Sequence, residues 1–233
     1  RKHPPMWLRV NQRQVNPTDY LHKIRSLGIK ANLASNTACA LLLEKPIEVT
    51  ALPGFAEGEV SVQDISAQLA ADFLAPQPDE RVLDACSAPG GKACHIMEIE
   101  KNLKDMVACD IDATRLEMVA SNSRRLNLPM KITKADARDL RNSEVRGFFD
   151  AVLADVPCSA SGALRRNPDV KLLRKPSDIS IFVNKQVSIL EGLWEVLKPG
   201  GRILYVTCSM LEAENDGVIH QFINSRDAEI IKI

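Results

Sequence analysis

Short apolar runs alternate with longer segments of helical periodicity over residues 81–233. The runs predict five strands, over residues 81–84, 106–110, 131–135, 149–155 and 202–207. The segments between them predict helices, just after Gly91 and over residues 113–126, 178–197 and 212–224. A last run, residues 228–233, predicts a further strand cut off where the sequence ends. This alternation predicts an α/β fold, a doubly wound and mostly parallel sheet with helices on both faces.

A shorter α+β pattern precedes this alternation. It predicts strands over residues 7–10, 38–43 and 59–62. Asn16 followed by Pro17 indicates a helix start. Three apolar residues follow at helical spacing and are expected to face inward: Leu21, Ile24 and Leu27. A second helix is predicted over residues 64–74, with Ile65, Leu69 and Phe73 on one face. We therefore expect a small α+β module over residues 1–60 and an α/β domain over residues 61–233.

Charge is unevenly distributed along the chain. The net charge of the whole is zero, but residues 1–50 carry eight Lys and Arg against three acids. This basic module suggests a polyanionic partner such as RNA, although a basic face that only meets solvent is an equally good interpretation.

Other bulk features narrow the class of protein. No apolar run approaches the roughly 20 residues of a membrane helix, so we expect no membrane partner. Six cysteines without a C-x-x-C pair favour reduced thiols in a cytoplasmic protein and argue against a metal site. The sequence starts at Arg1 without Met, so a fragment is expected, and we expect it to be a monomer.

Residues 82–92 form a strand–turn–helix pattern typical of nucleotide-binding domains. The glycines allow backbone N–H groups to approach a ligand closely. The turn is not a P-loop, because Ala93 follows Lys92 and Cys86 occupies the position of the early glycine. It also lacks the G-x-G-x-x-G of dinucleotide sites. A glycine-rich turn without a ligand is the alternative for this stretch alone.

Acidic residues occur at four predicted strand ends: Asp84, Asp110, Asp136 and Asp155. Ligands bind at the carboxyl ends of strands in open α/β sheets. An acid at Asp110 can accept hydrogen bonds from the ribose hydroxyls of a nucleoside cofactor, and Asp136 would face its adenine. S-adenosylmethionine fits better than NAD, because it has no pyrophosphate and its sulfonium tolerates an acidic pocket. Any single acid could instead be a helix cap or turn residue.

Cys158 and Cys208 follow the fourth and fifth predicted strands, which suggests covalent chemistry. Cytosine C5 is a poor nucleophile until a thiolate adds to C6. Thiolates need nearby positive charge or a helix start, and basic residues cluster after Cys158. From that cluster we expect Arg165, Arg166 and Lys171 to bind RNA. An inert buried thiol is the alternative for each cysteine.

Four segments resemble the motifs of the Sun/nucleolar-antigen family of RNA 5-methylcytosine methyltransferases: residues 62–68, 84–92, 155–159 and 207–209. The resemblance is closest to the bacterial Fmu (Sun, RsmB) branch, whose members methylate cytosine in 16S ribosomal RNA. It implies a Rossmann-like methyltransferase fold and S-adenosylmethionine as cofactor.

The resemblance also implies roles for single residues. Cys208 would be the nucleophile on cytosine C6, and Cys158 would assist proton removal and product release. Asp110 and Asp136 would hold the ribose and adenine, and Asp155 would lie between cofactor and target base. The methionine end of the cofactor would be wrapped by Ser87, Ala88, Pro89, Gly90, Gly91, Lys92 and Ala93.

The chain departs from the family pattern at Ser87 and Ala93, where Ala or Thr is common, and it lacks the helical domain that usually precedes the basic module. Two other functions remain open. One is a methyltransferase for a small molecule or a protein side chain, with structural cysteines. The other is a non-catalytic RNA-binding assembly factor.

Overall fold

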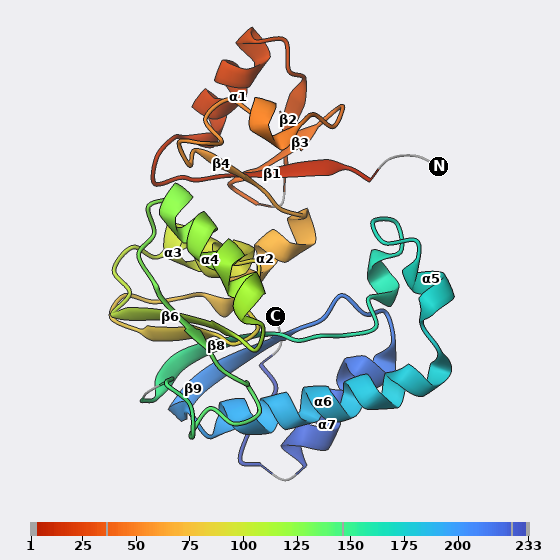
Figure 1. Ribbon diagram of the computed structural model, residues 1–233. Helices are drawn as coiled ribbons and strands as arrows, with labels where there is room; N and C mark the ends of the chain where they lie inside the picture. The colour runs from red at the N-terminus through yellow and green to blue at the C-terminus, as the bar shows by residue number, and fades with distance from the viewer. Residues whose placement is uncertain (1–3, 36, 146, 225, 232–233) are drawn as a thin grey trace.

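The computed structural model describes residues 4–35, 37–145, 147–224 and 226–231, and contains two β-sheets (Figure 1). The first is a four-stranded antiparallel sheet in the order β2-β3-β1-β4. The second is a five-stranded parallel sheet in the order β7-β6-β5-β8-β9. In Figure 1 the first sheet lies at the top, above the helices that cover one face of the second.

The N-terminal sheet is short-stranded and packs against one helix. Its strands are β1 (Met6–Val10), β2 (Ala31–Leu33), β3 (Ala40–Leu43) and β4 (Val60–Val62). The helix α1 (Pro17–Ser26) begins at Asn16, whose side chain accepts the Thr18 N–H. A 3₁₀ turn, η1 (Val49–Ala51), completes the module.

Leu27 does not face the core as predicted. The helix ends one residue earlier, and Leu27 is its C-cap, with 62% of its surface exposed. The chain then reverses at Gly28, which has a φ of 81°. Ile24 is buried as predicted, and Tyr20 is buried beside it in the core of the module.

The parallel sheet confirms the predicted α/β fold. Its strands are β5 (Arg81–Asp84), β6 (Asp105–Asp110), β7 (Lys131–Lys134), β8 (Phe149–Asp155) and β9 (Leu197–Val206). The helices are α2 (Ile65–Leu74), α3 (Gly91–Ile99), α4 (Ala113–Arg125), α5 (Val170–Leu173), α6 (Pro176–Trp194) and α7 (Asp216–Ile223).

Neighbouring residues of one strand supply two separate cores. Val82 packs with α2, α3 and α4, whereas Leu83 packs with α6 on the opposite face. This alternation is the period-2 geometry of a strand buried on both sides. The predicted face of α2 is not its most buried one, because Phe73 is exposed and Ala71 and Leu74 are buried.

Three expectations at the C-terminal end are wrong. The strand β9 begins at Leu197, five residues before the predicted start, and a register shift opposite Phe149 and Ala151 accommodates its Pro and Gly residues. The predicted helix over residues 212–224 is a 3₁₀ turn, η3 (Glu212–Glu214), followed by α7. Residues 228–231 form no strand, and residues 232–233 lie outside the described part of the chain.

Two arginines connect the N-terminal module with the domain that contains the parallel sheet. Arg9 of β1 donates to both oxygens of Glu98 on α3, at 2.8 and 2.7 Å, and its Nη1 donates to the carbonyl of Gly91 at 2.7 Å. In the other direction, Arg125 of α4 donates to the carbonyls of Phe55 and Val60. The start of α3 is therefore bonded directly to the N-terminal sheet.

Candidate functional site

The carboxyl ends of β5, β6, β8 and β9 lie along one edge of the parallel sheet. Because all neighbouring pairs are parallel, the chain leaves every strand at this edge. Asp84, Asp110 and Asp155 are the last residues of their strands, and Asp136 follows β7 by two residues. The pattern of acids predicted from the sequence is thus assembled in space.

The glycine-rich turn is fastened to this edge. The Ser87 N–H donates to the Cys109 carbonyl at 3.0 Å, and the Ala88 N–H donates to Asp110 Oδ2 at 3.2 Å. Gly90 has a φ of 95°, and a Cβ there would lie 3.0 Å from Val119. Both facts require glycine at the point where α3 begins.

The remaining turn residues differ in what they can offer a ligand. The Ser87 hydroxyl is buried and has no hydrogen-bond partner among the described residues. Pro89 is exposed, whereas the Ala93 side chain is fully buried in the core. Lys92 Nζ donates to Asp155 Oδ2 at 2.5 Å, so this cation neutralises the acid beside the cysteines.

Asp84 and Asp110 are both buried acids. Burial, assisted by the nearby Asp155, raises the pKa of Asp84 to about 7. Asp110 is 4% exposed and accepts the N–H groups of Ala88 and Asp112. This concentration of carboxylates makes the edge favourable for a cationic ligand.

Asp136 is engaged by its own loop. Arg138 donates to both of its oxygens, with the shortest contact 2.5 Å, and these bonds lower the pKa of Asp136. The side chain lines a hollow of about 630 Å³ between this loop and α6. Its expected contact with adenine stays a prediction.

Cys158 and Cys208 lie next to each other, with 3.2 Å between their sulfur atoms. The final β8–β9 pair, Asp155 with Val206, starts both loops at the same level, and each cysteine comes two or three residues later. Cys158 is buried and Cys208 is exposed.

The two sulfurs have opposite tendencies to ionise. The side-chain hydrogen bond between the two sulfurs, with backbone N–H groups nearby, lowers the pKa of Cys158 to about 7. The same contact raises the pKa of Cys208. The other four cysteines are poor thiolates, because burial raises their pKa: Cys39, Cys86, Cys94 and Cys109.

The pattern analysis missed Glu214, a fully buried acid in the 3₁₀ turn η3. It accepts hydrogen bonds from Ser159, Ser209 and Gln186. Ser159 and Ser209 directly follow the two cysteines. The available sequence indication is an acid six residues after Cys208, in a segment predicted to be a helix over residues 212–224.

The predicted RNA-binding residues lie on an exposed segment between β8 and α6. Arg166 donates to the Asp64 carboxylate at 2.5 Å and to the Pro5 carbonyl, so it ties this segment to the base of the N-terminal module. Arg165 and Lys171 are exposed at the surface. Nearby, Arg174 donates to the Ser159 carbonyl, next to Cys158.

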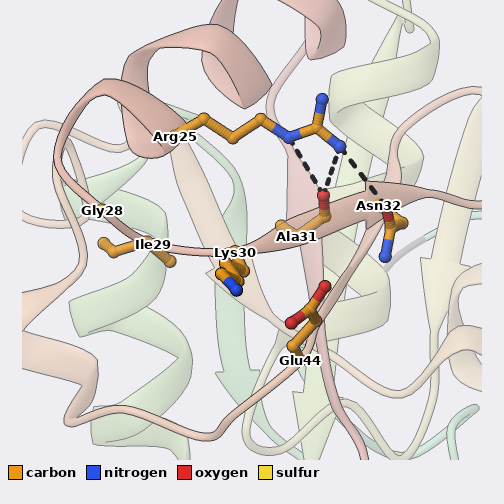
Figure 2. A pocket seen from close by; sticks show the side chains of 7 residues that line it. All are labelled: Arg25, Gly28, Ile29, Lys30, Ala31, Asn32 and Glu44. Atoms are coloured by element: carbon orange, nitrogen blue, oxygen red, sulfur yellow. Dashed lines mark hydrogen bonds between the residues drawn. The ribbon is translucent and has the colours of Figure 1, made fainter.

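A further hollow, of about 260 Å³, lies on the N-terminal module (Figure 2). Figure 2 shows Arg25 bonded to the Ala31 carbonyl and to Asn32. None of the predicted site residues lines this hollow. Among the described residues, no cluster of His, Cys, Asp and Glu could hold a metal, and no helix could cross a membrane.

Comparison with protein families matches the model "16S rRNA methyltransferase RsmB/F" to residues 71–233. A ferredoxin-like domain of the RsmF/B type matches residues 1–50. A ribosomal RNA small subunit methyltransferase B from Pseudomonas syringae is 45% identical over 95% of this chain and 49% of its own length. That from Pasteurella multocida is 47% identical over 97% of this chain and 52% of its own length. The chain thus spans about half the length of these relatives.

Solved structures give the same architecture. A methyltransferase homologue from Pyrococcus horikoshii superposes with a TM-score of 0.86, at 28% identity, over 100% of this chain and 73% of its own. NSun6 from the same organism, solved with SFG, has a TM-score of 0.86 over 95% of this chain and 80% of its own. At 18% identity the latter similarity concerns the fold alone.

Proposed function

Because the chain belongs to the RsmB/F family of 16S rRNA methyltransferases, we propose that it transfers a methyl group from S-adenosylmethionine to C5 of a cytosine in 16S ribosomal RNA. The observation that carries the cytosine-C5 assignment is the pair of sulfurs 3.2 Å apart at the strand ends, beside Asp155. Covalent activation of the base would use both thiols, one as the nucleophile and the other as its proton acceptor.

The residues of the turn fit this cofactor. Ser87 offers a buried hydroxyl without a partner among the described residues, Gly90 and Gly91 allow close approach, and Asp110 offers a buried carboxylate that already accepts the Ala88 N–H of the turn. S-adenosylmethionine, when bound, supplies a methyl group on a cationic sulfur, and the buried carboxylate Asp110 favours that charge. Asp136 is proposed to complete the adenine side.

The thiol pair is proposed to carry a single proton at neutral pH. Transfer of that proton from Cys208 to Cys158 leaves a thiolate on Cys208, which forms a bond to cytosine C6. The electron pair of the C5–C6 double bond would then be available to form a bond from C5 to the methyl group, which the cofactor would supply with loss of its bond to sulfur.

Product release breaks the bond between Cys208 and cytosine C6. Cys158 passes its proton to water, becomes a thiolate again and assists removal of the C5 proton. The electrons of that C–H bond restore the C5–C6 double bond and expel the Cys208 thiolate. Asp155, to which Lys92 donates a hydrogen bond, is proposed to accept a hydrogen bond from the amino edge of the cytosine.

The base must leave its stack for C6 to be reached, so the substrate is a flipped or single-stranded cytosine. Arg165, Arg166 and Lys171 are proposed to bind the surrounding phosphates. The chain is proposed to act as a monomer, and its substrate class makes the bacterial cytoplasm its proposed site of action.

Two cysteine variants test this function on 16S rRNA fragments. Cys208→Ala is expected to abolish methyl transfer. Cys158→Ala is expected to form the Cys208 adduct more slowly, because the Cys208 proton must then pass to water. It should still accumulate a protein–RNA adduct that survives denaturing electrophoresis, because product release lacks Cys158. Cys94→Ala, which removes a buried thiol of α3, serves as the control and should retain activity.

Retained methylation in Cys208→Ala would remove it as the nucleophile and favour a methyltransferase with structural cysteines. RNA binding without any methylation, unaffected by cofactor or by either change, would instead favour a non-catalytic assembly factor. Mapping of 5-methylcytosine in the product identifies the base and the carbon.

A further inference from the structure

We propose that Glu214 is a positioning residue that sets the separation of the two sulfurs. Its carboxylate lies between the loop after β8 and the loop after β9, and it bonds to both. The inference deepens the proposed function and rests on it for the chemical roles of Cys158 and Cys208.

The contacts of Glu214 divide evenly between its oxygens. Oε1 accepts the Ser159 N–H at 2.8 Å and the Gln186 side-chain N–H at 3.1 Å. Oε2 accepts the hydroxyls of Ser159 and Ser209, both at 2.5 Å. Since each serine directly follows a cysteine, one carboxylate determines how far apart the two cysteine backbones lie.

Glu214 remains charged in spite of its burial. Burial opposes the charged form, but the hydrogen bonds from Ser159, Ser209 and Gln186 outweigh it and hold the pKa of Glu214 below its usual range. With 0% of its surface exposed, the carboxylate cannot touch RNA or cofactor. Its effect on the reaction must pass through the residues it bonds.

The turn that carries Glu214 is itself fixed to β9. The Tyr205 hydroxyl donates to the Glu214 carbonyl at 2.7 Å, and the Thr207 hydroxyl donates to Asn215 at 2.6 Å. These bonds allow little movement of the carboxylate, which is what a spacer between two loops requires.

Few other bonds join the two loops. The last ladder bond runs from the Val156 N–H to the Val206 carbonyl, before either cysteine. Beyond it, the Gly162 N–H donates to the Cys208 carbonyl, and the hydroxyls of Ser159 and Ser161 lie 3.3 and 3.1 Å from that of Ser209. Among the residues that the structure describes, Glu214 is the one anion in this network, and it joins the residues next to both sulfurs.

Oxidative cross-linking of the two thiols tests the spacing without RNA. Diamide takes two electrons and two protons from the Cys158–Cys208 pair, becomes the hydrazine and leaves an S–S bond. Because the sulfurs lie 3.2 Å apart and a disulfide needs about 2.05 Å, the wild-type protein should cross-link rapidly. Peptide mass spectrometry after alkylation measures the rate.

Glu214→Ala is expected to cross-link about 10- to 100-fold more slowly, since sub-ångström misplacement of reacting groups has effects of this size. Glu214→Gln is expected to stay close to wild type, because its amide can donate to both serine hydroxyls while its oxygen accepts as before. Glu212→Gln, an exposed acid on the same turn, is the matched control.

Ser209→Ala keeps the test decisive if Glu214→Ala does not fold. It removes the bond from Glu214 to the Cys208 side, together with the contacts of the Ser209 hydroxyl with Ser159, Ser161 and the Leu211 N–H, and should also slow cross-linking. Wild-type cross-linking in Ser209→Ala, or in folded Glu214→Ala, would overturn the proposal. Alkylation of Cys208 alone should become faster, because separating the sulfurs removes the contact with Cys158 that raises the pKa of Cys208.

These outcomes are independent of the proposed reaction. Failure of Cys208→Ala to lose methylation would reject the catalytic roles yet leave the cross-linking result intact. Conversely, a Glu214 variant that cross-links slowly but methylates at the wild-type rate would show that Glu214 sets the spacing of the thiols without affecting the reaction.

Discussion

The contact between their sulfurs distinguishes Cys158 and Cys208 from the other cysteines. The hydrogen bond between them is the main reason why the pKa of Cys158 falls to about 7. Sequence spacing places both residues at strand ends, but only contact between the sulfurs creates the difference in ionisation.

The pH dependence of alkylation checks this arrangement. In the wild type, labelling of Cys158 by iodoacetamide should rise with pH around a midpoint near 7. Cys208→Ala removes the donor while burial remains, so the pKa of Cys158 should rise and the midpoint should move to higher pH. An unchanged midpoint would show that the backbone N–H groups alone stabilise the thiolate.

At the scale of elements, α6 is packed directly on the loop that carries Asp136. A Cβ on Gly192 would lie 2.2 Å from the Ala137 carbonyl oxygen and 2.7 Å from the carbonyl carbon of Arg138. These are backbone atoms of the loop that follows β7, so they cannot move aside as easily as the end of a flexible side chain. Gly192 therefore decides how closely the helix approaches the candidate cofactor edge.

Gly192→Ala should lower the free energy of unfolding by about 1–3 kcal/mol, the usual effect of overpacking. Because the displaced loop carries Asp136, binding of S-adenosylmethionine should weaken as well. Urea denaturation and titration calorimetry measure the two effects. Asn184→Ala, at an exposed position of the same helix that does not line the hollow, is the control and should change neither.

At the scale of the whole molecule, the buried pair of Arg9 and Glu98 links the N-terminal module to α3. Their side chains are 0% and 3% exposed, and Arg9 also bonds the Gly91 carbonyl at the start of the helix. The module is thus attached to the same turn that is proposed to hold the cofactor.

Arg9→Met should destabilise the protein by about 3–5 kcal/mol, because it leaves the Glu98 carboxylate buried without its partner. Denaturant unfolding measures this, and Arg9→Met with Glu98→Leu should recover part of the loss. Arg13→Met, which removes one exposed bond to the Met97 carbonyl, should cost within about 0.5 kcal/mol. Equal losses in Arg9→Met and Arg13→Met would contradict a special role for the buried pair.

The sequence by itself determined the features that depend on neighbouring residues. Strand periodicity placed Asp84, Asp110 and Asp155 at strand ends, and parallel topology then requires those ends to share an edge. The glycine-rich turn and the two cysteine motifs were also local, which is why the α/β fold and the family could be predicted correctly.

The sequence pattern did not predict the ends of helices and strands correctly where those ends depend on tertiary contacts. Leu27 fits the helical period but lies beyond the last turn of α1. The Pro199-Gly200-Gly201 stretch resembles a strand breaker, yet β9 lies at the edge of the sheet, where one side needs no ladder bonds and a register shift is tolerated.

Only the tertiary structure decided the contacts between distant residues. Arg9 meets Glu98 across 89 positions, Cys158 meets Cys208 across 50, and Glu214 meets Ser159 across 55. No periodicity encodes such pairs, because they depend on how loops and helices pack once the sheet has formed. The sequence therefore identified which cysteines to consider, whereas the fold brought them together and placed a buried carboxylate between their loops.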